Sequence, residues 1–184
     1  MTKKEAVKLV ADHFKSQNIE YRSGIDNGCV QLVFAFDAGN APDHCIESCI
    51  WFYEEGLEAR VYYSALGAEI CRKSEHIGAL LEVLNFINAR VFLSCSDGGR
   101  MLYEPHMLYT PRIYMTADGC CDITITTMIA YDFFKLAPIE TLDYLTAYCP
   151  ELLDRLTLPI YGVLLGKETA AWAIAYIKRE LLKE

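Results

Sequence analysis

The chain has 184 residues, of which 53% are hydrophobic and 12% aromatic, and its formal net charge is −8. A chain of this length buries roughly 70% of its unfolded surface, so one domain can fold without metal ions or disulfide bonds. The acidic balance weighs against nucleic acid as a partner, because phosphate binding requires a basic surface. The longest apolar runs fall far short of the ~20 residues of a membrane-spanning helix.

Residues 3–18 are predicted to form the first helix. Thr2 and Glu5 fit a capping box at its start. Its apolar stripe consists of Val7, Val10 and Phe14. His13 adjoins this stripe and is expected to be a surface histidine. Charged residues stand where a secretion signal would have its apolar core, so we expect a cytoplasmic protein with reduced cysteines.

The following segment predicts antiparallel strands. Asn27-Gly28 favours a tight hairpin turn, because Gly accepts a positive φ. Beyond this turn, alternating apolar residues predict strands at about 30–37, 44–53 and 57–64. Connections as short as these indicate antiparallel neighbours.

Two of these strands divide clearly into two faces. One face is apolar and is formed by Val30, Leu32, Phe34 and Phe36 of the first strand and by Leu57, Ala59, Val61 and Tyr63 of the third. If this face meets the core, the opposite face carries Val33, Trp51, Tyr53, Arg60 and Tyr62. A solvated sheet face with Trp and Tyr suits the binding of a partner. The alternative is that a C-terminal helix covers this second face.

A helix is then predicted at about 75–88, capped by Ser74. Its buried stripe comprises Ile77, Leu80, Leu81, Leu84 and Ile87. Near residue 89 the apolar period changes from helical to alternating, so this helix leads directly into a strand. Further strands are predicted at about 90–96, 100–104, 107–116 and 120–129.

After residue 131 the pattern is helical. Helices are predicted at about 139–154, around Pro159 and at 169–183. The last helix contains AAWAIAYI (170–177), which is apolar nearly all round and indicates burial against the body of the protein or a partner chain. The whole order predicts an α+β fold made of two helix-plus-β-meander units with antiparallel sheets, followed by C-terminal helices.

This order of elements, with the segment Leu84-Asn85-Phe86-Ile87-Asn88, the strand VFLSC and the turn DGG, resembles the YbjN-like family. That family shares its fold with the type III secretion chaperones. The resemblance covers residues 3–155, whereas the helices of 156–184 and an added strand in the second meander depart from the pattern. Asn88 is expected to stop the second helix, so that Val91 enters the sheet facing inward.

The resemblance implies helices packed on an antiparallel sheet and often a homodimer. Some members of the family are described as sensory-transduction regulators. The related secretion chaperones bind extended segments of client proteins. No catalytic residues come with the resemblance.

Cysteine chemistry offers a different interpretation. Among the eight cysteines, Cys95 and the pair Cys120-Cys121 lie beside predicted turns, but no histidine motif accompanies them. Cys45 and Cys49, with His44, invite comparison with a metal site. Residues four apart on a strand lie about 13 Å from each other, which is too far for one zinc ion. We therefore predict no catalytic residue, metal or cofactor.

The expected function is that of a non-enzymatic cytoplasmic adaptor or regulator, chaperone-like and homodimeric, which binds a polypeptide. It would bury apolar side chains and pair with its partner at a sheet edge, without nucleic acid or membrane as a partner. Two alternatives stay open. One is a thiol-dependent enzyme, and the other is a small-ligand sensor with a pocket between sheet and helices.

Overall fold

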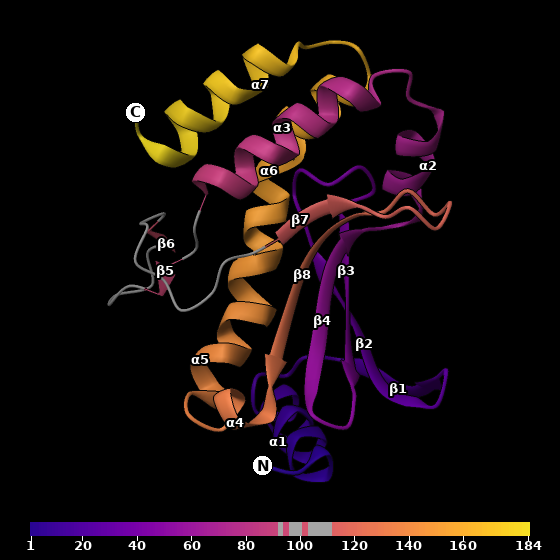
Figure 1. Ribbon diagram of the computed structural model, residues 1–184, viewed down its shortest axis with the longest axis vertical. Helices are drawn as coiled ribbons and strands as arrows, with labels where there is room; N and C mark the ends of the chain where they lie inside the picture. The colour runs from indigo at the N-terminus through magenta and orange to yellow at the C-terminus, as the bar shows by residue number, and fades with distance from the viewer. Residues whose placement is uncertain (92–93, 96–100, 103–111) are drawn as a thin grey trace.

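The computed structural model describes residues 1–91, 94–95, 101–102 and 112–184, which form an α+β fold (Figure 1). Six antiparallel strands make one sheet in the order β1-β2-β3-β4-β8-β7. They are β1 (Tyr21–Asp26), β2 (Cys29–Asp37), β3 (Cys45–Phe52), β4 (Gly56–Tyr63), β7 (Arg112–Met115) and β8 (Ile123–Ala130). A separate pair is formed by β5 (Ser94–Cys95) and β6 (Met101–Leu102).

The helices are α1 (Lys3–Ser16), α2 (Ala65–Lys73), α3 (Ile77–Arg90), α4 (Tyr131–Phe134), α5 (Pro138–Asp143), α6 (Cys149–Leu164) and α7 (Ala170–Ile177). Two π-helical turns, η1 (Tyr144–Tyr148) and η2 (Lys178–Leu182), join α5 to α6 and extend α7. In Figure 1, α6 runs along the sheet, α3 and α7 lie at one end of α6, and α1 lies near the other. Among the described residues, no helix is long and apolar enough to cross a membrane.

The first hairpin contains a strand that the prediction omitted. Asn27 and Gly28 form the expected turn, with φ of 48° and 80°, but β1 precedes it and pairs with β2 along its whole length. β1 reads YRSGID and has no apolar alternation, because it is an edge strand with little contact to the core. The Asn27-Gly28 turn was therefore a better sequence signal for β1 than the hydrophobic pattern of the strand.

The two predicted units share one sheet. β8, from the second unit, pairs with β4 from the first across Gly56–Tyr62 and Ala130–Thr124. The predicted strand at 120–129 is confirmed only from Ile123 onward, and β7 covers only 112–115 of the strand predicted at 107–116. Residues 107–111 and most of 96–104 lie outside the described residues.

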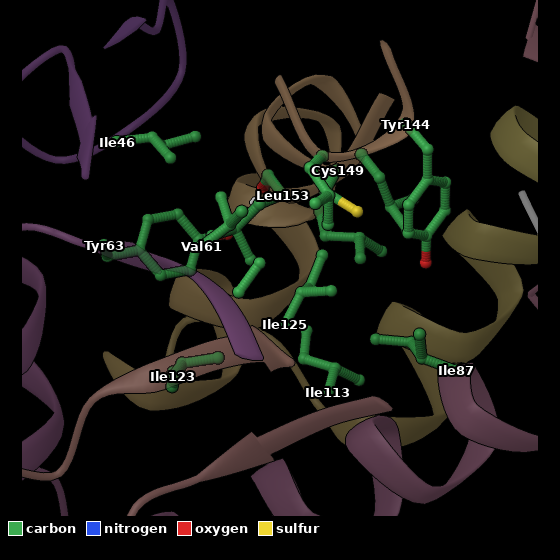
Figure 2. Packing of buried hydrophobic residues seen from close by; sticks show 14 of the residues in the cluster. Ile46, Val61, Tyr63, Ile87, Ile113, Ile123, Ile125, Tyr144, Cys149 and Leu153 are labelled. Carbon is green, nitrogen blue, oxygen red and sulfur yellow. Dashed lines mark hydrogen bonds between the residues drawn. The ribbon is translucent and has the colours of Figure 1, made fainter. Parts of the chain in front are cut away.

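One face of this sheet carries the core. Figure 2 shows Val61, Ile113 and Ile125 of the sheet with Ile87 of α3 and Leu153 of α6, all of them buried. The cluster extends over α1 and α7 as well. On the same face, the hydroxyl of Tyr63 donates a hydrogen bond of 2.6 Å to the carbonyl of Leu153. The apolar face predicted from β2 and β4 is thus the face that the helices cover.

The helix predicted at about 75–88 is observed as α3, displaced by two residues, and a further helix precedes it. α2 is an additional helix, and Ser74 follows it instead of capping α3. The Ser74 hydroxyl donates to the carbonyl of Leu164 and accepts from the backbone N–H of His76, so it ties the bend to α6. In α3, Leu81 is 49% exposed and Val83 is buried in its place.

Asn88 does not end its helix, which continues to Arg90. Its side chain accepts a hydrogen bond from the backbone N–H of Ile113 and donates one to the carbonyl of the same residue, each 2.8 Å long. The side-chain amide of Asn88 therefore pairs with the backbone of β7 as a neighbouring strand would. This contact links the edge of the sheet to α3. Val91 is buried, but it is the C-cap residue of α3 and does not enter the sheet as expected.

The C-terminal helices also differ from the prediction. Pro159 lies inside α6 and does not begin a separate helix. Residue 155, where the resemblance to the YbjN-like family ends, falls within α6. The following helix, α7, packs on α6 and α3. Only one side of AAWAIAYI is buried, through Ala170, Ala173 and Ile177. The sequence of an alanine-rich helix reads as apolar on every side, but alanine is small and tolerates exposure to solvent. Such a sequence therefore does not require burial on every side.

At the N-terminus, the capping box of Thr2 and Glu5 is confirmed. His13 is only 7% exposed, which contradicts the expectation of a surface histidine. Its Nε2 lies 3.9 Å from a carboxylate oxygen of Asp143. The contact between α1 and α5 encloses His13. It joins segments far apart along the chain, so the local sequence carries no signal of it.

Candidate partner-binding surface

The second face of the sheet, here called the open face, carries three cross-strand rows of side chains. These rows follow from the register of five neighbouring strands, in the order β2-β3-β4-β8-β7. The rows are Gln31-Trp51-Glu58-Met128, Val33-Cys49-Arg60-Thr126-Arg112 and Ala35-Glu47-Tyr62-Thr124-Tyr114. Side chains alternate between faces along a strand, so these residues all lie opposite the core.

The open face brings together the five residues predicted from sequence. Val33, Trp51, Arg60 and Tyr62 belong to the three rows. Tyr53 follows β3, and its hydroxyl donates a 3.0 Å hydrogen bond to the Glu58 carboxylate. Their place on one face agrees with the sequence analysis, because side chains alternate between the faces of a strand, and their role in binding stays a prediction.

A polar network holds the large side chains of this face in place. The Trp51 indole N–H donates to the Asp26 carboxylate at 3.1 Å, and the Arg60 guanidinium lies 5.1 Å from the Trp51 ring centroid. Arg60 Nε also donates to Glu58 at 2.7 Å. Glu58 is buried, and its hydrogen bonds to Arg60 and Tyr53 offset the cost of removing a carboxylate from water. The result is a pre-positioned set of aromatic and charged side chains.

The tyrosines and the buried thiol of the open face favour their neutral forms. Burial, and then the hydrogen bond to Glu58, raise the pKa of Tyr53. Burial likewise raises the pKa of Tyr62 and brings that of Cys49 to about 12. Cys49 is covered although it lies on this face, and its Sγ is 3.4 Å from the Gln31 side-chain oxygen. A thiol with so high a pKa is a poor nucleophile.

No described helix covers the open face. α6, which could have done so, contacts β3 and β4 from the opposite side, where Tyr63 meets Leu153 and Thr157. The alternative that a C-terminal helix covers the face is therefore wrong for the described part of the chain. Trp51, Arg60 and Tyr62 are each half-buried by their neighbours in the sheet.

A groove of about 840 Å³ continues this surface beyond Tyr114 and Met128. Its other wall comes from α4 and the turn after it, where Phe133 and Leu136 are 71% and 78% exposed. Sequence reasoning missed this groove, because it depends on the pairing of β4 with β8, which are about 70 residues apart along the chain. The only local signal was an apolar cluster, Phe133, Phe134 and Leu136, after a predicted strand.

The cysteine candidates do not converge on a site. Cys120 is exposed, but the neighbouring Asp118 carboxylate raises its pKa. Cys121 is half-buried, and the side chain of Cys95 lies outside the described residues. Within residues 1–91 and 112–184, no three His, Cys, Asp or Glu side chains are grouped so that they could hold a metal ion.

Comparisons of the chain with protein-family models, with curated proteins and with solved structures gave no match. The resemblance to the YbjN-like family and to the type III secretion chaperones therefore stays a prediction.

Proposed function

We propose that this protein binds a polypeptide partner on the open face of its sheet, as a chaperone-like adaptor or regulator without catalytic activity. The observation that carries the proposal is the open face itself, which bears Trp51, Arg60 and Tyr62 and is covered by no described helix. Aromatic and arginine side chains dominate the binding energy of many protein interfaces.

The hydrogen-bond network of the open face supports this proposal. Trp51 is fixed by Asp26 and Arg60, and Arg60 is fixed by Glu58. A side chain that is already ordered loses little conformational entropy when a partner binds. The YbjN-like relationship, the chaperone-like version of the α+β fold and the cytoplasmic location belong to the same proposal.

The structure offers less to the alternatives. The thiol-dependent enzyme would need a cysteine with a lowered pKa, whereas the shifts at Cys45, Cys49, Cys71 and Cys120 are all upward. A small-ligand sensor would have a place in the groove beside β8. A ligand there would raise the melting temperature at saturating concentration.

The two tryptophans of the chain provide a matched test. Immobilised protein is exposed to a lysate of the cells that produce it, and the retained polypeptides are compared for Trp51→Ala and Trp172→Ala. Trp172 lies on α7, stacked on Tyr176 and away from the open face. We expect Trp172→Ala to retain the same partner as the wild type, and Trp51→Ala and Tyr62→Ala to lose it.

Melting curves establish that each variant is folded. Retention of no specific polypeptide by the wild type, or equal retention by Trp51→Ala and Trp172→Ala, would contradict the proposal. The homodimer is a separate prediction, and the mass from light scattering tests it.

A further inference from the structure

The first strand, β1, forms one edge of the sheet. It pairs with β2 on one side from Tyr21 to Asp26, and no strand of the described residues pairs with its other side. The pairing with β2 has no bulge, because each residue of β1 has one partner in β2, and β1 contains no proline. Bulges and prolines commonly protect edge strands from pairing with another chain. β1 is therefore suited to pair with a further strand.

The outer side of β1 lies beyond the reach of the residues that the structure does not describe. β1 and β7 are opposite edges of the sheet, and in Figure 1 the strands β5 and β6 lie on the other side of α6 from β1. The longest undescribed stretch, 103–111, connects Leu102 of β6 to Arg112 of β7, so it extends at most about 36 Å. A path from β7 to β1 and back across the sheet measures roughly 48 Å, because neighbouring strands lie about 4.8 Å apart.

The turn of the first hairpin shows which backbone groups of β1 point outward. Asn27 and Gly28 both have a positive φ, so they form a two-residue turn of type I′, and the residues that flank such a turn, here Asp26 and Cys29, exchange hydrogen bonds. The backbone groups of Asp26 therefore point toward β2. Because these groups alternate sides along a strand, three other residues point outward. They are Tyr21, Ser23 and Ile25.

The far end of β2 gives the same alternation independently. Directly after β2, the N–H of Ala38 donates to the carbonyl of His44, on the side of β3. Counted back along β2, the groups of Cys29 then point to the other side, toward β1. Both ends of β2 therefore assign the same outward groups to β1.

The charged side chains of β1 are complementary to themselves. Arg22 and Asp26 are exposed and lie four residues apart on the side of the open face, with Gly24 midway between them. Arg22 has no ion pair with a described residue, and the Asp26 carboxylate is held by the indole N–H of Trp51. A two-fold axis at Gly24 would place Arg22 of each copy directly opposite Asp26 of the other.

The same axis aligns the backbone and buries an apolar side chain. It places Ser23 of each copy opposite Ile25 of the other, and both residues have outward-pointing backbone groups. Ile25 is 78% exposed. In the paired arrangement it would lie diagonally beside Ile25 of the second copy, at a separation that cross-strand side chains can bridge.

We propose that two copies of this chain associate through β1, antiparallel and with two-fold symmetry about Gly24. The main chains of Ser23 and Ile25 form about four ladder hydrogen bonds across the axis, and Arg22 of each copy pairs with Asp26 of the other. The two sheets become one continuous sheet with both open faces on the same side. This inference defines an interface for the homodimer and does not depend on the proposed function.

The concentration dependence of the mass is the first test. A single pair of six-residue strands is a small interface, of the kind found in weak complexes, so the dimer should dissociate on dilution. Sedimentation velocity from about 10 μM to about 1 mM should show the mass rising from one chain toward two. High salt should weaken the association, because the ion pairs are exposed. The mass of one chain throughout would overturn the inference.

Charge reversals test the register. Arg22→Glu and Asp26→Lys each place like charges opposite one another at both ends of the contact, so each variant should dimerise at least about tenfold more weakly than the wild type. An equimolar mixture of the two variants should associate again, because opposite charges then face each other. Lys167→Glu, in the exposed turn after α6, changes the net charge as Arg22→Glu does and should dimerise like the wild type. Undiminished dimerisation of Arg22→Glu, or no association in the mixture, would contradict the assigned register.

A proline substitution tests main-chain pairing without a change of charge. Ser23→Pro removes an outward N–H and leaves the hydrogen bonds between β1 and β2 in place, so this variant should fold and stay monomeric. Its melting curve establishes that it is folded. A dimer of Ser23→Pro as stable as that of the wild type would overturn the inference. Capture of a partner polypeptide by monomeric Ser23→Pro would leave the proposed function intact, so the two proposals fail separately.

Discussion

The two faces of the sheet use the same strands for different purposes. On the covered face, Phe52, Leu57 and Val61 are almost completely buried under helices. On the open face, their immediate neighbours Trp51, Glu58 and Arg60 hold one another through hydrogen bonds and a cation–π contact. The first face is ordered by burial and the second by polar contacts between side chains. We therefore expect the order of the open face to contribute less to folding than the burial on the covered face.

The largest expected difference between the faces is at two adjacent aromatic residues of β3. Phe52→Ala should destabilise the protein by about 3–5 kcal/mol, since it leaves a cavity in the core. Trp51→Ala should cost about 1–2 kcal/mol, because it removes only the contacts with Asp26 and Arg60. Urea denaturation of both variants measures the difference. Equal losses would mean that the open face is also part of the core.

A matched pair of valines sharpens the same comparison without aromatic side chains. Val61→Ala on the covered face should lower the free energy of unfolding by about 2–3 kcal/mol. Val33→Ala on the open face should lower it by less than about 1 kcal/mol. A Val33→Ala loss as large as that of Val61→Ala would show that something covers the open face in the isolated protein.

Asn88 fastens the outer strand β7 to the covered side, and its removal tests that attachment. Asn88→Ala should cost about 1–3 kcal/mol, because the N–H and C=O of Ile113 lose their partners. Asn85→Ala, at an exposed position of the same helix, controls for the change in helix propensity. Denaturation that fails to separate the two variants would refute the bracing role of Asn88.

The smallest expected effect concerns thiol reactivity outside the core. Because the Asp118 carboxylate raises the pKa of Cys120, Asp118→Asn should increase the rate of Cys120 alkylation at pH 8 severalfold. Cys49, with a pKa of about 12, should stay unmodified in the native protein and react after denaturation. Mass spectrometry of the alkylated peptides reads both results. Rapid native labelling of Cys49 would revive the thiol-dependent alternative.

Where periodicity is regular, the sequence was sufficient to predict the structure. The alternation in β2 and β4 placed Val33, Arg60 and Tyr62 on one face, because a strand has only two faces. α1 was predicted with its cap, since Thr2 and Glu5 are local signals. In these elements, local pattern and tertiary environment agree.

The remaining features depend on contacts between distant segments. β1 lies at the edge of the sheet, where a polar sequence is tolerated. Its pairing with β2 determines its conformation more than the β-propensity of its residues does. Leu81 fits the helical stripe by spacing, yet the helices that pack on α3 bury Val83 instead. The groove arises only when β8 joins β4, and nothing in either strand alone specifies that pairing. The part of the site that was missed is the part formed by long-range topology.

Photo-crosslinking tests the central claim, that the open face is the contact surface, most directly. A photoreactive phenylalanine derivative replaces Val33 on the open face or Leu158, which is exposed on α6. The cells that produce each variant are then irradiated. We predict a discrete adduct with another polypeptide at position 33 and none at position 158. Adducts at position 158 alone, or at neither position, would contradict the account.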